Sequence, residues 1–144
     1  MVNMLYAQIG AIFVVTICLF AFLKGDNPER AGAAAYIVGW FSSLILQQQS
    51  PQYSLYGVFI LDVLMLAILC VISWRSRRSW PIWAAALQLL AVTSHVMILT
   101  NTKTPIASLY TILNLTGYGV LICIGVGAFW AWQERKVEAE FASR

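Results

Sequence analysis

The chain has 144 residues, of which 60% are hydrophobic and only 10% are charged, and its net charge is +3. Soluble domains carry about 25% charged residues, so a soluble fold of this size could not cover its core with so few. Several uncharged runs reach the roughly 18–20 residues that cross a hydrocarbon core of about 30 Å. The composition therefore predicts an all-α integral membrane protein, and it excludes a large soluble catalytic or nucleotide-binding domain.

The pattern predicts a bundle of five transmembrane helices joined by short connections. We place the spans at about 4–23, 31–49, 54–73, 81–100 and 106–132, so that 1–132 forms one transmembrane domain and 133–144 a short charged cytoplasmic tail. Short connections join antiparallel neighbours, which predicts an up-down bundle. The first span has no basic leader or small-residue cleavage site, so we expect it to remain as a membrane helix. The tail is expected to continue the last helix into water.

Four prolines mark helix starts. Asn27, Ser50 and Thr104 each stand directly before a proline, and Ser79 stands two residues before Pro81. Proline is tolerated in the first helical turn because its missing N–H would have no partner there. The side chain before it can accept a hydrogen bond from a free backbone N–H. We therefore expect these four polar residues to cap their helices.

Small residues recur on the second and fifth spans and predict close helix packing. Ala35, Gly39 and Ser43 follow one another at four-residue spacing, and Gly117 and Gly125 lie on the fifth span. Such stripes let another helix approach closely. The sequence leaves open whether that helix belongs to this chain, to a second copy or to another protein.

The positive residues fix the expected orientation. If the N-terminus lies outside, the inside segments hold Lys24, Arg30, Arg75, Arg77, Arg78, Arg135, Lys136 and Arg144, and the outside segments hold only Lys103. This bias follows the positive-inside rule and predicts an outside N-terminus and a cytoplasmic C-terminus. Five tryptophans gather at the inside ends, where we expect them to anchor in the membrane interface: Trp74, Trp80, Trp83, Trp130 and Trp132.

Polar residues inside the apolar spans are the candidates for function. Counting about 1.5 Å per residue, Asp62 and Asn114 lie roughly 12 Å below the outer ends of the third and fifth spans, and His95 roughly 8 Å below that of the fourth. Gln47 lies near them in depth, and Gln88 lies deeper. A charge in the bilayer is costly, so Asp62 must face protein or water and be neutral or paired. We expect it to face His95 or Asn114.

Three interpretations of this cluster stay open. It can be a polar clasp that holds helices together, because lipid supplies no hydrophobic drive between them. It can line an outward-facing cavity that binds a small molecule, a quinone head group or protons, to which an Asp–His pair is suited. In the third, His95 ligates a haem or a metal. Because the chain has one histidine, ligation by two histidines would need an oligomer, and no HxxxH pattern or His/Cys cluster is present, so we predict no metal or cofactor.

No sequence motif points to catalysis. Walker loops, GxGxxG, HExxH, GxSxG and CxxC are all missing, and no charge-rich groove exists for nucleic acid. The cysteines, Cys18, Cys70 and Cys123, each sit inside an apolar run, and we expect them to be buried as small hydrophobic residues. No catalytic residue is predicted.

The segment "WPIWAAALQLLAVTSH" from Trp80 to His95, with "NPERAGAA" earlier and Asp62 between them, resembles a family of small multi-pass bacterial inner-membrane proteins. That resemblance implies a bacterial inner membrane and supports the predicted topology. It brings no activity to any residue, and it directs attention to Asp62, Gln88 and His95.

Two functions are expected from these observations. The first is a non-catalytic accessory subunit of a larger membrane complex or a homo-oligomeric scaffold, with the lipid bilayer and other membrane subunits or itself as partners. The short connections, the small-residue stripes and the lack of catalytic motifs favour it. The alternative is a membrane protein that handles a small molecule, a quinone or protons at Asp62, His95 and Asn114.

Overall fold

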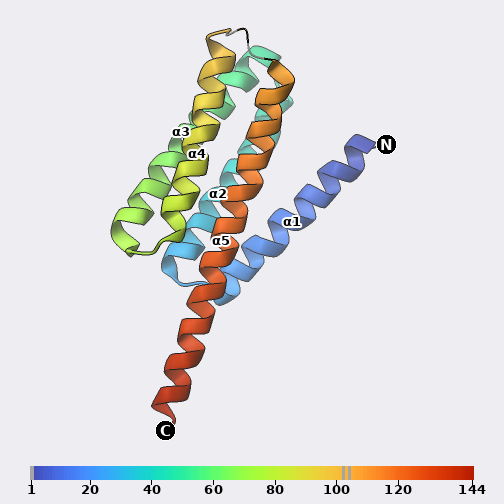
Figure 1. Ribbon diagram of the computed structural model, residues 1–144. Helices are drawn as coiled ribbons and strands as arrows, with labels where there is room; N and C mark the ends of the chain where they lie inside the picture. Colours follow the sequence, from blue (N-terminus) through green and yellow to red (C-terminus); the bar gives the residue numbers. More distant parts are fainter. Residues whose placement is uncertain (1, 102, 104) are drawn as a thin grey trace.

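The computed structural model describes residues 2–101, 103 and 105–144, and it confirms an all-helical protein (Figure 1). The described residues form five helices: α1 Val2–Lys24, α2 Asn27–Gln47, α3 Pro51–Ser76, α4 Trp80–Leu99 and α5 Ile106–Ala142. The α2–α3 and α4–α5 connections lie at one end of the bundle, which we call the outer end after the predicted orientation. The α1–α2 and α3–α4 connections lie at the opposite, inner end.

The helix starts follow the prolines with one correction. Ser50 and Ser79 occupy the cap positions of α3 and α4 as expected, but their side chains make no capping hydrogen bond. In α2 the cap is Asp26, so the expected cap Asn27 is instead the first helical residue. Asp26 is favoured because its backbone N–H donates to the Glu29 carboxylate at 2.9 Å, which satisfies a helix-end donor. The expected cap Thr104 lies outside the described residues.

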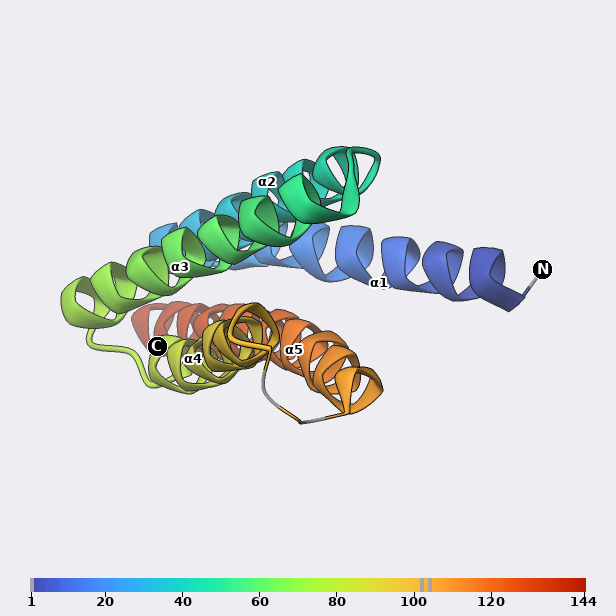
Figure 2. The ribbon, with the colours of Figure 1, turned by 90° about the horizontal axis from the view of Figure 1, so that it is seen from above.

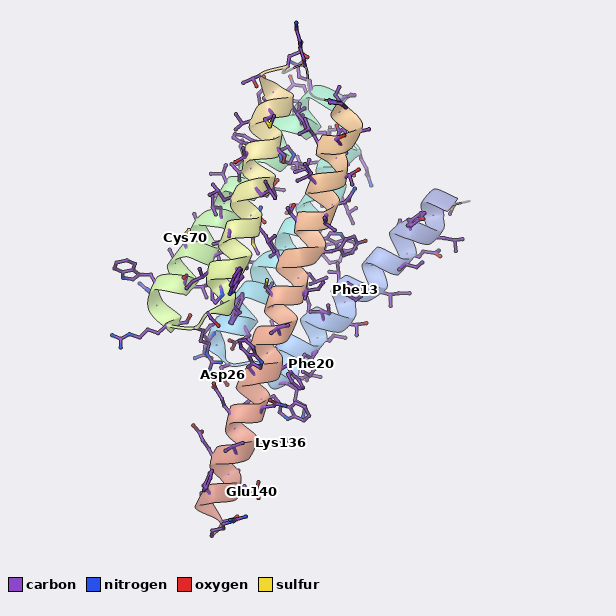
Figure 3. All side chains as sticks on the ribbon, in the orientation of Figure 1. Phe13, Phe20, Asp26, Cys70, Lys136 and Glu140 are labelled. Carbon is purple, nitrogen blue, oxygen red and sulfur yellow. The ribbon has the colours of Figure 1, made fainter. Side chains whose placement is uncertain are left out.

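Four of the five helices are long and apolar enough to cross a membrane, namely α1, α3, α4 and α5. In α2, small residues together with Arg30 and Gln47 lower the mean hydropathy below that of the other four. The last helix continues without a break through the charged tail, so that Lys136 and Glu140 lie on a helical extension beyond the bundle (Figure 3).

α1 diverges from the bundle towards its outer end. Among the described residues it contacts only α2 and α5, and the views from the side and from above agree that its N-terminal half points away from them (Figures 1 and 2). Met4, Leu5, Tyr6 and Ile9 are accordingly exposed. The inner half of α1 is packed, and Cys18 and Ala21 are completely buried there.

The apolar core lies in the inner half of the bundle. It is built from small and aliphatic side chains of all five helices: Val14, Cys18, Ala21, Ala33, Met65, Leu69, Ile72, Ala84, Val120, Leu121, Ile124 and Ala128, together with Trp80. Of the three cysteines expected to be buried, Cys18 is buried and Cys123 half-buried, but Cys70 is exposed on α3, where it borders a surface hollow with Ile82 and Ala85 of α4. The tight inner half leaves the outer half less filled.

Candidate functional site

A polar cavity occupies the outer half, between α2, α3, α4 and α5. It has two adjoining lobes of about 280 Å³ and about 620 Å³. Both lobes are lined by the same eight residues, Ser43, Gln47, Val58, Asp62, Gln88, Leu113, Asn114 and Gly117. These volumes fall in or near the range of small-molecule sites, roughly 300–1,000 Å³.

Asp62 lies at the junction of the two lobes. Its Oδ1 accepts a hydrogen bond of 2.8 Å from Nε2 of Gln88, and its Oδ2 lies 2.9 Å from Nδ1 of His95. The expected contact between Asp62 and His95 is therefore confirmed. Gln88, which lies on α4 like His95, bonds to the same carboxylate. The Asp62 side chain keeps 23% of its surface exposed, so the carboxylate borders the cavity.

His95 is buried beside this carboxylate. Only 4% of the residue is exposed, and its ring lies 6.3 Å from that of Phe59, centroid to centroid. The Nδ1 atom is within ion-pair distance of Asp62, but it lacks the alignment of a hydrogen bond to any described residue. Nδ1 is itself enclosed by protein, so the group beside it is the Asp62 carboxylate and this atom does not open into the cavity.

The other two candidates line the cavity from α5 and α2. Asn114 is exposed although it lies within an apolar helix, and it has no hydrogen bond to Asp62 or His95 among the described residues. Gln47 is also exposed, and its Nε2 donates to Oγ of Ser43 at 3.0 Å. All five candidate ligand-site residues therefore border one cavity.

Helical periodicity explains why these residues converge. Gln88 and His95 are seven residues apart, which is close to two turns, and they share the buried face of α4 with Ala84 and Ala91. Asp62 continues the buried stripe of α3 by one turn beyond Met65. The outer ends of these stripes meet where the core stops, so the polar side chains face one another.

The small-residue candidates have two different environments. Ala35, Gly39, Ser43 and Gly117 line the smaller lobe, and a Cβ added at Gly39 would meet nothing within 4 Å. A Cβ at Gly125 would instead lie 3.2 Å from Cγ2 of Ile17 on α1. The stripe on α2 therefore borders open space, whereas Gly125 permits close contact between α5 and α1.

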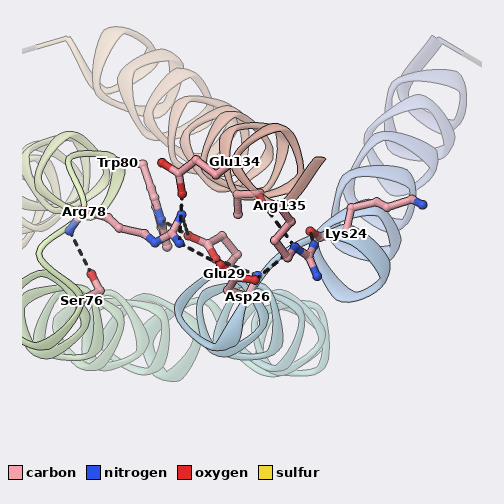
Figure 4. Close-up of polar contacts among 9 residues, drawn as sticks. Lys24, Asp26, Glu29, Ser76, Arg78, Trp80, Glu134 and Arg135 are labelled. Carbon is pink, nitrogen blue, oxygen red and sulfur yellow. Dashed lines mark hydrogen bonds and ion pairs between the residues drawn. The ribbon is translucent and has the colours of Figure 1, made fainter. Parts of the chain in front are cut away.

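A second polar cluster at the inner end was not predicted. Glu29 is completely buried, and its Oε1 accepts a hydrogen bond of 2.7 Å from the Trp80 indole (Figure 4). Arg78 lies 3.6 Å from the same oxygen and donates to Asp26 at 2.8 Å. This corrects the expectation that Trp80 anchors in the interface, because only 3% of it is exposed.

The last helix closes this inner cluster. Glu134 lies 3.5 Å from Arg78, and Arg135 lies 3.5 Å from Asp26 and donates to the backbone carbonyl of Lys24 (Figure 4). One sequence feature points to this cluster, a short run of acidic and basic residues directly before the second span. That run was explained by capping and orientation alone, and neither can indicate a partner fifty residues away.

The arrangement in the outer cavity can bind and orient hydrogen-bonding groups and exchange protons with them. Within the described part of the chain, no three His, Cys, Asp or Glu side chains gather as metal ligands. Below the cavity, Met65, Leu69 and Leu121 belong to the apolar core. The polar cavity and the inner cluster are thus separated by packed side chains.

The fold and this cavity define an all-helical protein of the membrane-bundle type, in which a polar site lies among helices long and apolar enough to span a bilayer. No protein-family model matches the chain, and neither a search of curated proteins nor one of solved structures finds a match.

Proposed function

We propose that this chain is a multi-pass membrane protein that binds a small hydrogen-bonding molecule in the cavity around Asp62. It crosses the bacterial inner membrane five times, with the N-terminus outside and the C-terminus in the cytoplasm. The bias of positive residues supports the orientation, and the packing of α2 against α1, α3 and α5 supports its inclusion as a span.

The exposure of Asn114 is the observation that carries the proposal. At mid-helix in an apolar span, an amide with no aligned partner is stable only if it meets water or a polar molecule. Gln47 and Asp62 are partly exposed in the same space. Asp62 is paired across helices with Gln88 and His95, as a clasp requires, but Asn114 has no hydrogen-bond partner among the described residues and Gln47 bonds only within α2, so a clasp alone does not account for these two amides.

The site has the properties of a binding site more than those of a conducting path. The larger lobe reaches Gln49, Pro51 and Ser54 at the outer end of the bundle. Towards the inner end, packed core side chains close the path through the bundle, and Leu69, Leu121 and Ile124 are all completely buried there. A molecule can therefore be held from the outer side without a polar route to the inner side in this conformation.

The test is to purify the protein gently from its native membrane and to identify by mass spectrometry the small molecules that it releases. Wild type should release a defined compound, and Asp62→Asn should release at least tenfold less, because a charged hydrogen bond contributes about 1.5–3 kcal/mol. Glu138→Gln makes the same chemical change on the exposed tail and should behave as wild type. An empty wild-type particle, or equal amounts from Asp62→Asn, would overturn the proposal.

The accessory-subunit function is a second candidate, because the outer half of α1 exposes Met4, Leu5 and Ile9 away from the bundle. A partner protein in the membrane could cover this segment. Weighing the same purified particle and identifying co-purifying chains tests it: a stoichiometric second chain supports it, and a particle of this chain alone excludes it.

A further inference from the structure

A hollow of about 590 Å³ lies on the surface between α3 and α4, beside the connection that joins them at the inner end (Figure 1). We call it the α3–α4 hollow, and its walls are formed by Cys70, Ser73, Trp74, Arg77, Ile82 and Ala85. Cys70 marks its deeper end on α3 (Figure 3). The hollow shares no residue with the cavity around Asp62, so it is a separate site.

The α3–α4 hollow changes in character along its length. Arg77 lies at the end next to the connection, and Cys70 lies seven residues earlier, roughly 10 Å deeper along α3. Ala85 and Ile82 line the hollow from α4 and are apolar, and no acidic residue borders it. Trp74, 90% exposed, is the side chain typical of the membrane interface. In the predicted topology the arginine therefore lies at head-group depth and the apolar wall at acyl-chain depth.

Arg77 and its neighbour Arg78 have different environments. Arg78 turns into the bundle and meets three carboxylates, those of Asp26, Glu29 and Glu134. Arg77 is exposed, and its guanidinium has no ion pair or hydrogen bond to any residue that the structure describes. The cation on the wall of the hollow is therefore free to pair with an anion from outside the chain.

The backbone at Arg77 is a second, independent observation. Its φ of 53° and ψ of 22° are left-handed, and they end α3 in a conformation that glycine adopts without steric cost. An arginine in this conformation is strained, and such strain occurs mainly where a side chain has a functional role. The contacts within the bundle do not supply that role, because the guanidinium has no partner there.

We propose that the α3–α4 hollow binds one anionic phospholipid of the leaflet at the inner end. The Arg77 guanidinium donates to the lipid phosphate, for which its planar pair of N–H groups is suited. One acyl chain lies over Ile82, Ala85 and Cys70. Basic pockets between transmembrane helices bind anionic head groups in this way. The inference goes beyond the proposed function, and it does not depend on what the cavity around Asp62 binds.

The experiment titrates the purified protein in detergent with phosphatidylglycerol and with phosphatidylcholine of the same acyl chains, and native mass spectrometry measures the bound lipid. Wild type should bind phosphatidylglycerol more tightly. Arg77→Gln should weaken phosphatidylglycerol about fivefold and leave phosphatidylcholine within about twofold, the effect of one arginine on an anionic head group. Arg75→Gln removes the same charge two residues earlier, outside the hollow, and should bind both lipids like wild type.

Arg77→Gly separates lipid binding from folding. It removes the guanidinium and suits the left-handed backbone, so phosphatidylglycerol binding should fall as in Arg77→Gln while the melting temperature does not fall. Unchanged binding with a lower melting temperature would make Arg77 a structural residue and overturn the proposal.

The remaining outcomes test the ligand. Glycerol phosphate, the soluble head group, should not displace phosphatidylglycerol at equal concentration because it has no acyl chains, and displacement would overturn the lipid as the ligand. Equal weakening by Arg75→Gln and Arg77→Gln would show a general surface attraction and overturn the site. A wild-type protein that binds both lipids alike would overturn the anionic class.

Discussion

Trp80 is held between two glycines, and its indole nitrogen donates to a fully buried carboxylate. A Cβ at Gly32 would lie 2.8 Å from its ring, and one at Gly127 would overlap it. The indole gives Oε1 of Glu29 its hydrogen bond, since Arg78 is farther away at 3.6 Å, whereas Oε2 accepts from the Asp26 backbone N–H. A buried ionisable group that loses a partner destabilises the fold far more than an exposed one does.

Trp80→Phe tests this dependence. The ring is kept in part and the donor is removed, so the free energy of unfolding should fall by about 1–3 kcal/mol. Trp83→Phe makes the same change three residues later at a side chain that is 69% exposed, and it should be nearly neutral. Unfolding of both variants in mixed micelles gives the comparison, and equal effects would show that the hydrogen bond contributes nothing specific.

The glycines themselves give a second prediction at the residue scale. Gly127→Ala places a methyl group in the space of the Trp80 indole and should destabilise the protein by about 1–3 kcal/mol through overpacking. Gly39→Ala adds the same methyl group in open space and should be neutral or stabilise α2 by up to about 1 kcal/mol. The same unfolding measurement decides, and a stable Gly127→Ala variant would mean that Trp80 can move aside.

Among the elements, α5 has two functions in one continuous helix. Its first part borders the cavity and the core, and its last part carries Glu134 and Arg135 to the inner cluster. The Lys136 ammonium lies 3.9 Å from the centre of the Trp132 ring, one turn earlier on the same helix, as in a cation–π contact. Among the described residues after Lys136, the polar contacts stay within the tail: Ser143 donates to the carbonyl of Glu140, and Arg144 pairs with the Glu140 carboxylate.

Two truncations separate these parts. Removing 137–144 should leave the melting temperature within about 2 °C, whereas removing 133–144 should lower it further, because it deletes the contacts of Glu134 and Arg135. These pairs are partly exposed and contribute at most about 1 kcal/mol each, so the drop should be a few degrees. Equal melting temperatures would show that the tail does not stabilise the inner end.

Sequence patterns predict these elements better than they predict the contacts between them. Proline positions and apolar runs predict the five helices. The similar depths of Asp62 and His95 predict that these side chains approach each other. Both predictions follow from helix geometry. The contact of Glu29 with Trp80 did not follow, because burial of a charge depends on which helix faces turn towards each other. Gly39 shows the same limit, since a small-residue stripe looks alike whether it borders a helix or a cavity.

For the whole molecule, topology is the property on which every functional assignment depends. The divergence of α1 could not be read from its sequence, because an apolar helix looks the same against protein and against lipid. The hydropathy of α2 is also too low for composition alone to decide whether this helix crosses the membrane. Its 21 residues extend roughly 31 Å and it packs antiparallel to both α1 and α3, which favours five crossings over four.

Single cysteines in a background without native cysteines test this topology in intact cells. With five crossings and an outside N-terminus, a membrane-impermeant maleimide should label Gln49→Cys and Lys103→Cys at the outer connections, and it should not label Arg77→Cys at the inner one. If α2 did not cross, Gln49 would lie on the same side as Gly25, and Gln49→Cys and Gly25→Cys would be labelled alike. Labelling of Arg77→Cys and Gly25→Cys, with Gln49→Cys and Lys103→Cys unlabelled, would reverse the orientation and place the cavity mouth in the cytoplasm. Permeabilised cells provide the control, because all these positions should react there.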